Sequence, residues 1–228
     1  MIIGNGLLAT QFRQDFSDPK GWIIFASGVS NSGTTYRGEF DRERGLLKEA
    51  IEIRKPIAYF STCSISDQTL KKTQYVQHKS LMEEIVRSTK HHAIFRLPQV
   101  VGHTRNPHTL TNFIYNKITN GEPLQVWKQA RRNLLDVSDI GAVVRFFLQK
   151  SAEPNKTIEL AAPTNISVLN LVAIFEEVLQ KRARVQLIEG GSAYPVDSSQ
   201  FVAIAKHLGL NCSSDYYPAI IQKYYGKP

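Results

Sequence analysis

The sequence predicts an α/β fold in which helices cover both faces of a parallel sheet. Short apolar runs rich in Ile, Val and Phe alternate with amphipathic segments of helical period along most of the chain. Hydrophobic residues make up 42% of the 228 residues, which is enough for one sizeable core. Neither an internal repeat nor a low-complexity tract interrupts this pattern.

The first hundred residues contain the most regular alternation of strand-like and helix-like segments. Each apolar run is bounded by Gly, Pro, Ser or Asn, and each amphipathic stretch is long enough for a crossover helix. We expect strands near residues 2–3, 22–26, 57–61 and 93–96, and helices over residues 7–16, 42–53 and 76–89.

The regular alternation of strand-like and helix-like segments ends beyond Gly102. Asn106 and Pro107 open a helix that Gly121 and Pro123 close, which is typical of an insertion outside the main sheet. A helix with one apolar face follows over residues 136–149 and is expected to return to the sheet. We then expect, in order, a strand from residue 157, a helix over 168–181, a strand over 185–188 and a helix over 198–207 that ends at Gly209.

Composition restricts the class of protein. Lys and Arg number 28 against 20 for Asp and Glu, a net charge of +8 that fits an anionic partner, either nucleic acid or a phosphorylated small molecule. The basic residues are dispersed rather than striped, which disfavours nucleic acid. The two cysteines have no disulfide or metal-ligand spacing, no apolar run reaches the roughly 20 residues of a membrane span, and no secretory leader is visible. We therefore expect no metal, no membrane association and a cytoplasmic location.

A glycine-rich turn, Gly4-Asn5-Gly6-Leu7-Leu8-Ala9, follows the first predicted strand and opens the first helix. Glycines at such a turn allow a phosphate group to approach the backbone at the start of the helix. The motif is short, so an ordinary glycine turn between a strand and a helix remains an alternative.

Three polar side chains converge in the next candidate motif. Tyr75 and Lys79 lie four residues apart and share one face of a helix, where the ammonium favours the phenolate and brings the tyrosine closer to acid–base work. The strand before them ends in Ser61-Thr62-Cys63-Ser64, which places hydroxyl groups at the carboxyl end of a strand, where open α/β sheets bind ligands.

These residues together resemble the extended short-chain dehydrogenase/reductase superfamily, in particular its NAD-dependent epimerase/dehydratase members that act on sugar nucleotides. The resemblance covers nearly the whole chain. It rests on the order of the glycine turn, Phe25-Ala26-Ser27-Gly28-Val29-Ser30, Ser61-Thr62, Tyr75 to Lys79 with Glu83, Arg96-Leu97-Pro98-Gln99-Val100-Val101-Gly102, and Asp136-Val137-Ser138-Asp139.

The resemblance implies a Rossmann-like core over residues 1–162, with a substrate-side insertion near 103–133, and a small substrate-binding subdomain over 163–228. It implies NAD or NADP as cofactor, a nucleotide sugar as substrate and a homodimer that includes the helix near 76–89. Tyr75 would exchange a proton with a sugar hydroxyl while hydride passes to or from the nicotinamide. Lys79 would lower the pKa of Tyr75 and hold the nicotinamide ribose, and Thr62 would orient the substrate.

Further residues follow from the same resemblance. Gln99 is implied to bind the substrate, and a loop amide without a functional role is an equal alternative. Arg132 is implied to bind the diphosphate, and the alternative is a solvated surface charge. The implied cofactor-binding residues are Gly4, Asn5, Gly6, Leu7, Leu8, Ala26, Ser27, Gly28, Tyr75, Lys79 and Pro98. The implied substrate-binding residues are Thr62, Cys63, Ser64, Gln99 and Arg132.

The chain departs from this family near its start. Only 21 residues separate Gly4 from Phe25, whereas two further strands normally precede the strand that Phe25 resembles. We therefore predict a reduced sheet without its second and third strands. The acidic ribose anchor expected near residues 24–29 is also missing, although Arg13 or Trp22 is a conceivable substitute. The alternative function is a sugar-nucleotide-binding accessory protein that has lost the adenosine half of its cofactor site.

Overall fold

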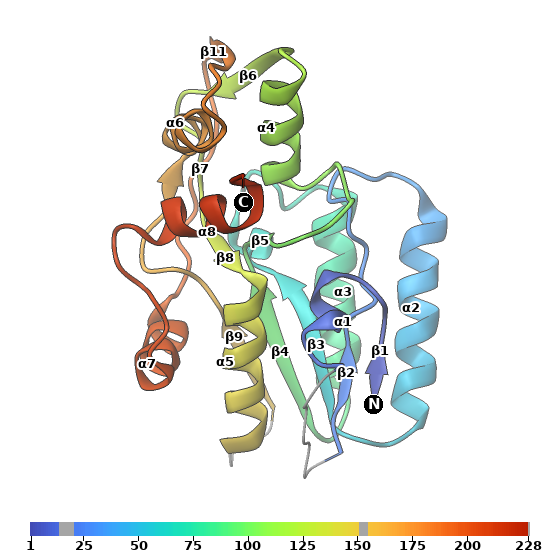
Figure 1. Cartoon of the computed structure of the whole chain (residues 1–228). Helices are drawn as coiled ribbons and strands as arrows, with labels where there is room; N and C mark the ends of the chain where they lie inside the picture. Colours follow the sequence, from blue (N-terminus) through green and yellow to red (C-terminus); the bar gives the residue numbers. More distant parts are fainter. Residues whose placement is uncertain (14–20, 151–154, 228) are drawn as a thin grey trace.

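The central element of the fold is a five-stranded sheet in which every pair of neighbours is parallel. The computed structural model describes residues 1–13, 21–150 and 155–227. The strands lie in the order β1 (Ile2–Ile3), β2 (Ile23–Phe25), β3 (Ile57–Thr62), β4 (His92–Leu97) and β9 (Lys156–Glu159) (Figure 1). The predicted α/β class is confirmed, and the strands that the apolar runs predicted are all present.

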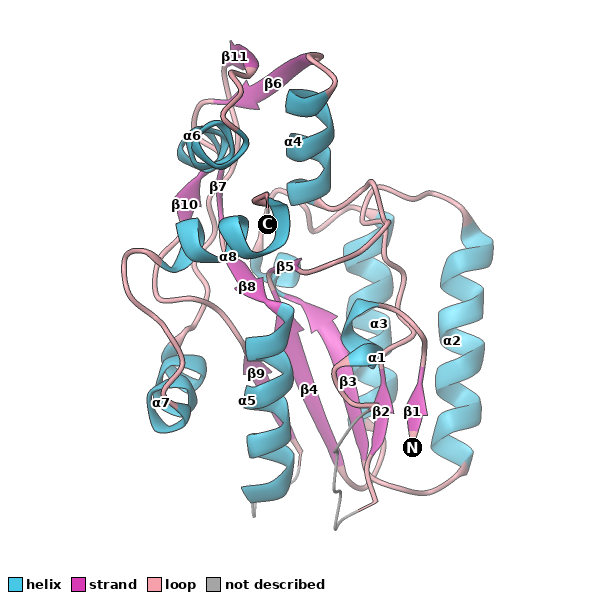
Figure 2. Cartoon of the chain, viewed as in Figure 1, coloured by secondary structure: helices cyan, strands magenta, loops and turns pink. Residues whose placement is uncertain are grey.

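Helices cover both faces of the sheet (Figure 2). One face is covered by α2 (Arg37–Glu52) and α3 (Gln74–Arg87), and the other by α1 (Leu7–Thr10) and α5 (Val137–Lys150), with α7 (Ser199–Leu208) beside α5. Alternate residues of one strand serve opposite layers: Ile23 and Phe25 pack with α2 and α3, whereas Ile24 packs in the larger core under α5.

The strand order confirms that the sheet is reduced. In the usual nucleotide-binding arrangement, order 3-2-1-4-5-6, the first strand is central and the order reverses beside it. Here β1 is an edge strand, and the order runs in one direction from β1 to β9. Within the described residues no strand occupies the outer side of β1, where the second and third strands would lie.

The first crossover carries a trace of this reduction. The steps from β1 to β2, β2 to β3 and β3 to β4 all go the same way across the sheet, but α1 lies on the face opposite α2 and α3 (Figure 1). Two crossovers that step the same way on opposite faces have opposite hands. The α2 and α3 crossovers have the usual right hand, so the β1–α1–β2 crossover is left-handed, which is rare.

A second lobe lies above the carboxyl ends of the strands (Figure 1). Two distant parts of the chain build it: α4 (Leu110–Thr119) and β6 (Pro123–Trp127) come from the predicted insertion, and α6 (Val168–Leu179) and β11 (Arg184–Ile188) from the later region. β6 and β11 pair in parallel, and β7 (Arg131–Arg132) pairs antiparallel with β10 (Ile166–Ser167). α7 returns to the main sheet, where it packs on α5 and β9. The predicted domain division at residue 162 remains a prediction.

The last helix, α8 (Tyr216–Tyr225), links the two lobes and was not predicted from the sequence. Its Tyr224 hydroxyl and Lys223 ammonium donate to Asp136, at 2.6 and 2.7 Å, at the end of β8 (Leu134–Asp136). β8 pairs with β5 (Gln99–Val101), which continues from β4, so α8 is bound to the junction between the lobes. At its other face, the ring of Phe175 from α6 meets the ring of Tyr225 at 5.0 Å.

The end of the first helix differs from the expectation. α1 ends at Thr10 instead of continuing to residue 16, and part of that predicted helix lies outside the described residues. The Thr10 hydroxyl donates to the Leu7 carbonyl, which satisfies an acceptor at the end of this single turn. Gly209 ends α7 in the left-handed conformation, as predicted. None of the helices in the described part of the chain has the length and hydropathy to cross a membrane.

Candidate functional site

The candidate site lies where β3 ends beneath the second lobe. Thr62 is the last residue of β3, and Tyr75 stands in the first turn of α3, whose N-cap is Thr73. The Tyr75 side chain is half-buried, and the Thr62 hydroxyl is near enough to lower its pKa. The structure therefore brings together two of the three predicted catalytic side chains, and Lys79 follows one helical turn later on the buried face of α3.

The protonation of Tyr75 differs from the expected direction. Burial raises the pKa of Tyr75 above its usual value and the Glu43 carboxylate raises it further, whereas the Lys79 ammonium and the Thr62 hydroxyl lower it. The net pKa is raised. The predicted influence of Lys79 is present, but burial outweighs it, so Tyr75 carries its proton at neutral pH.

Lys79 uses its whole donor capacity inside the protein. Its side chain is buried, and the ammonium donates to Glu43 Oε1 at 2.8 Å, the Tyr59 hydroxyl at 3.1 Å and the Phe60 carbonyl at 3.4 Å. An ammonium group has three N–H donors. In this arrangement none of them is left for a ribose, and the bond to Phe60, the longest, is the one whose release would cost least.

Glu43 on α2 is the functional candidate that the sequence interpretation missed. Its buried carboxylate accepts from Lys79, Tyr59 (2.7 Å), His78 Nε2 (3.1 Å) and the Val29 amide (2.8 Å). Burial opposes its charge, but the Lys79 ammonium and these hydrogen bonds hold the pKa of Glu43 far below its usual range. The many charged residues of α2 make it look like a solvated helix. One signal was present: Glu43 lies four and seven residues before the core side chains of Leu47 and Ala50.

The glycine turn has the shape of a phosphate-binding loop at its first two glycines. Gly4 has φ +121°, and a Cβ atom there would lie 2.3 Å from the Ala26 carbonyl oxygen, so only glycine lets β1 and β2 end this close together. A Cβ on Gly6 would meet no atom within 4 Å, which leaves open space above this residue. Arg13 donates to the Gly4 carbonyl at 3.2 Å, so its guanidinium lies beside the turn. Asn5 is exposed, and Leu7 and Leu8 are half-buried.

The predicted cofactor residues of the next loop have mixed surroundings. Ala26 continues the pairing of β2 with β1, because its amide donates to the Ile3 carbonyl at 2.8 Å. The Ser27 hydroxyl accepts from Arg42 at 2.9 Å. Gly28 lies against the buried cluster: a Cβ atom there would stand 2.8 Å from Lys79 Nζ. Any larger residue here would force the Lys79 ammonium to shift from its present contacts.

The predicted substrate residues divide between the site and its border. The Cys63 thiol is buried and donates to the Arg96 carbonyl at 3.4 Å, and burial raises its pKa. Ser64 lies near the hydroxyl of Tyr194, whose pKa it lowers against the larger effect of burial. Arg132 donates to the carbonyl of Ser192 at 2.9 Å, and Ser192 in turn donates to Asp67 at 3.0 Å. Residues 190–194, which the sequence interpretation did not single out, thus cover the segment after β3.

Pro98 and Gln99 lie at the junction of β4 and β5. Both are half-buried, and the Gln99 amide donates to the Asn133 carbonyl at 3.1 Å. That contact is made by the backbone of Gln99. The roles predicted for these residues, like those of the other site residues, therefore remain proposals.

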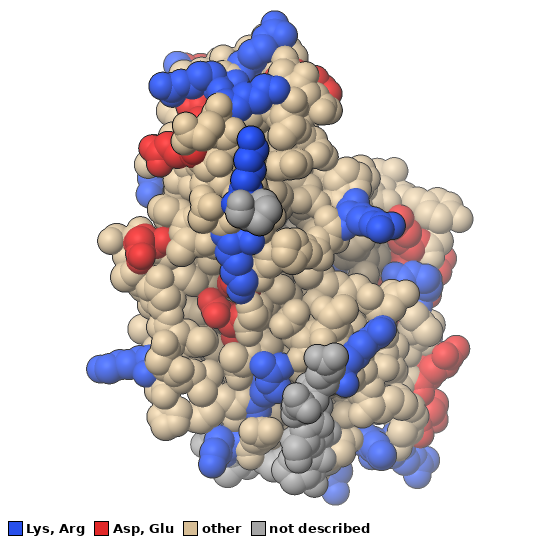
Figure 3. Space-filling model, viewed as in Figure 1, with Lys and Arg blue, Asp and Glu red and all other residues tan. Residues whose placement is uncertain are grey.

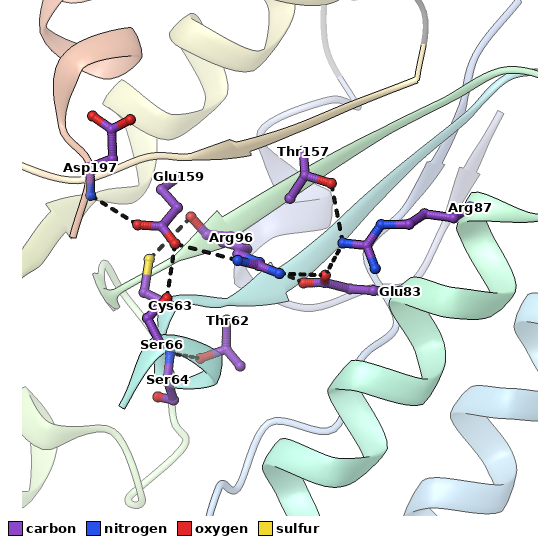
Figure 4. A network of polar contacts seen from close by, with 10 residues as sticks. All are labelled: Thr62, Cys63, Ser64, Ser66, Glu83, Arg87, Arg96, Thr157, Glu159 and Asp197. Carbon is purple, nitrogen blue, oxygen red and sulfur yellow. Dashed lines mark hydrogen bonds and ion pairs between the residues drawn. The ribbon is translucent and has the colours of Figure 1, made fainter. Parts of the chain in front are cut away.

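An ion-pair network that joins α3, β4 and β9 lies beside the site (Figure 4). Glu83 of α3 accepts from Arg96 Nε and Nη2 at 2.9 and 2.8 Å and also pairs with Arg87. Arg96 continues to Glu159 of β9 at 3.5 Å, and Glu159 accepts from the Ser66 hydroxyl at 3.1 Å. The network joins α3, β4 and β9 to the short helix η1 (Cys63–Ser66) that follows Thr62.

This network predicts a specific loss of stability in acid. Burial raises the pKa of Glu83, but Arg96 and Arg87 lower it more, so the net pKa is depressed. A depressed carboxyl stabilises the fold above its unfolded pKa of about 4.3, and that contribution is lost as the pH falls through the folded value. We expect Glu83→Gln to lower the free energy of unfolding by about 2 kcal/mol at pH 7 and by clearly less at pH 3, measured by urea denaturation.

The neighbouring Glu84 on the same helix is exposed and provides the matched control. Glu84→Gln should change the free energy of unfolding by less than about 0.5 kcal/mol at either pH. A Glu83→Gln variant whose deficit is the same at pH 3 as at pH 7 would show that the ionised carboxylate contributes nothing.

Comparisons with known proteins bear on this arrangement. Residues 60–161 match the model of the NAD dependent epimerase/dehydratase family. This part of the chain, 102 of the 228 residues, is similar to that family. The matched segment of 102 residues, from β3 to just beyond β9, includes Thr62, Tyr75 and Lys79, whereas the glycine turn and Glu43 lie outside it. No curated protein sequence matches the chain significantly.

Solved structures show the same fold at low sequence identity. The enzyme WbmG of Bordetella bronchiseptica, in complex with NAD and UDP, has a TM-score of 0.68 and 15% identity over 87% of this chain and 70% of its own. RMD from Pseudomonas aeruginosa, complexed with NADPH, has a TM-score of 0.69 and 12% identity over 96% and 85%. UDP-glucose 4-epimerase of Thermus thermophilus, complexed with NAD, has a TM-score of 0.66 and 14% identity over 94% and 79%. The epimerase/dehydratase segment therefore lies in a Rossmann-like fold.

Proposed function

We propose that this protein is an NAD(P)-dependent enzyme that acts on a nucleotide sugar as an epimerase, dehydratase or reductase. The observation that carries the proposal is the placement of Thr62 at the carboxyl end of β3 and Tyr75 in the first turn of α3, with Lys79 one turn further along, all inside the epimerase/dehydratase segment. Solved proteins of the same fold bind NAD or NADPH, and several also bind UDP or a UDP sugar. Their example supports both ligand classes for this chain.

The residues present fit one end of a nicotinamide dinucleotide. Gly4 and Gly6 allow a phosphate to approach the turn, Leu7 and Leu8 lie in the first turn of α1, and Arg13 adds a positive charge beside them. Ala26, Ser27 and Pro98 would border the rest of that half. At the adenosine end the described structure has no strand beyond β1 and no acidic ribose anchor. We infer that the phosphate and nicotinamide end is held and the adenosine end is not.

The chemistry divides between the bound group and the protein. A bound nicotinamide would accept or give up a hydride at the sugar carbon. When hydride is delivered to the carbon, Tyr75 donates its proton to the sugar oxygen, and when hydride is removed, the Tyr75 phenolate takes the proton of the sugar hydroxyl. Thr62 holds the Tyr75 hydroxyl and orients the same oxygen. Lys79 stabilises the phenolate through its charge. Cys63, Ser64, Gln99 and Arg132 are proposed to border the sugar and its diphosphate.

A second function is favoured by two observations. β1 is an edge strand, and Lys79 donates all three of its hydrogen bonds within the protein. A binding protein for nucleotide sugars that no longer uses a dinucleotide would show both features.

Homodimer assembly through α3 and a cytoplasmic location are further proposals. Figure 3 shows Lys and Arg dispersed over the viewed face, which fits small anionic ligands better than a nucleic-acid track.

Calorimetric titration of the protein with NAD, NADP, nicotinamide mononucleotide and a panel of nucleotide sugars tests these functions. We expect a nucleotide sugar to bind. We also expect nicotinamide mononucleotide to bind within about tenfold of NAD, because the adenosine half makes few contacts here. Binding of a nucleotide sugar without any nicotinamide ligand would select the second function, and binding of neither class would contradict both.

A further inference from the structure

A buried charge cluster lies behind the proposed catalytic pair. Glu43 and Tyr59 are fully buried and Lys79 is 3% exposed, and the three come from α2, β3 and α3. The Glu43 carboxylate accepts four hydrogen bonds, which matches the lone-pair capacity of its two oxygens. Such a fully satisfied buried carboxylate is stable only in the ionised form. Its charge is therefore a fixed part of the site.

We propose that Glu43 is a positioning residue of the site: it fixes the Lys79 ammonium beneath Gly28 and balances its charge, and so sets how strongly Lys79 acts on Tyr75 one turn earlier on α3. This inference rests on the proposed role of Tyr75 in proton transfer. It assigns to α2, which lies outside the epimerase/dehydratase segment, a residue that controls the reactive group on α3.

The geometry leaves Lys79 little freedom to act in another way. Two of its donors meet Glu43 and Tyr59 at 2.8 and 3.1 Å, and the space above it is closed by Gly28, where even one added carbon would lie 2.8 Å from Nζ. Lys79 therefore influences Tyr75 through its charge, because its ammonium is held in place and is not free to move toward a bound ligand. Its effect depends on how much of that charge Glu43 cancels.

Charged and polar side chains from several elements act on Tyr75. Lys79 and Glu43 act by charge with opposite signs, the Thr62 hydroxyl lowers the pKa of Tyr75, and Tyr59 is coupled to Tyr75 by charge. His78, on the same turn as Lys79, donates to the other oxygen of Glu43 and stacks on Phe40 of α2 at 4.8 Å between ring centroids. If the negative charge of Glu43 is removed, the positive charge of Lys79 acts on Tyr75 without opposition. If Lys79 is removed, the negative charge of Glu43 acts on Tyr75 without opposition. The two changes should therefore shift the ionisation of Tyr75 in opposite directions.

The experiment measures the ionisation of Tyr75 in the ligand-free protein. Tyrosine labelled with carbon-13 at Cζ is followed by NMR against pH, and the Tyr75 signal is assigned by its absence in Tyr75→Phe. We expect Glu43→Gln to raise the acid dissociation constant of Tyr75 by about tenfold or more. We expect Lys79→Met to lower it, and Glu49→Gln, an exposed glutamate on the same helix, to leave it unchanged.

A folded Glu43→Gln protein in which Tyr75 ionises as in the wild type, or less readily, would overturn the proposal and leave Glu43 with a purely structural role. If Glu43→Gln does not fold, the Lys79→Met variant decides, because an unchanged or increased ionisation of Tyr75 there would overturn the proposal as well. No ligand is present in these measurements. Failure of the proposed function would appear in the calorimetric titrations instead, so the two outcomes are separate.

Discussion

Replacing Tyr75 with Phe is expected to reduce turnover of the nucleotide-sugar substrate by about 100- to 10,000-fold, the range over which a positioned acid–base group accelerates proton transfer. The ring remains in place, so substrate binding should change little and the loss should appear in kcat rather than in KM. Steady-state kinetics with the substrate identified by calorimetry would measure it, with circular dichroism as the check on folding.

Tyr36 provides the control for this substitution. It is 70% exposed at the start of α2, and its loss of a hydroxyl in Tyr36→Phe should leave turnover unchanged. A folded Tyr75→Phe protein with turnover within about threefold of the wild type would mean that another group transfers the proton, and the proposed mechanism would be wrong.

The largest expected loss of stability comes from Phe175. Its ring is fully buried in the main core, between α6 and α8, and contacts the ring of Tyr225 at 5.0 Å. Phe175→Ala removes that ring from a packed interior and leaves a cavity, which costs about 3–5 kcal/mol. In a chain of this size the melting temperature should fall by roughly 10 °C, as measured by thermal denaturation.

Phe113 of α4 in the same lobe is the matched comparison. It is 43% exposed, so Phe113→Ala should cost less than about 1 kcal/mol. Equal losses from the two substitutions would show that α6 and α8 are not packed on a common core as the structure has them.

The main sheet could be predicted from the sequence because its strands are buried on both faces. Residues 57–60 and 93–95 are continuous apolar runs, and such runs between turns predict strands of a parallel sheet. The small number of strands in the sheet could also be predicted, because only 21 residues separate Gly4 from Phe25. The pairs of short strands in the second lobe were not, because strands of two or three residues carry no periodic signal.

The site was predictable in its order and not in its electrostatics. Thr62, Tyr75 and Lys79 follow one another along a single stretch of chain, where spacing on a strand and a helix is enough to place them. The partner of Lys79 comes from 36 residues earlier, on a helix whose charges point to solvent almost everywhere else. Only the tertiary packing of α2 against α3 makes that contact. The pKa of Tyr75 depends on the same packing, so its direction could not be read from the spacing.

The hand of the first crossover indicates where this fold can accept more chain. With α1 on the face of α5, a right-handed continuation would lead to a strand on the free edge of β1, not to β2 on its other side. A βαβ unit inserted between α1 and β2 would therefore relieve the unusual hand and enlarge the sheet at the same time. It would also make the strand order reverse at β1, which creates the crevice in which sheets of this kind hold a whole dinucleotide. The junction after α1 is thus a grafting point for an adenosine-binding module.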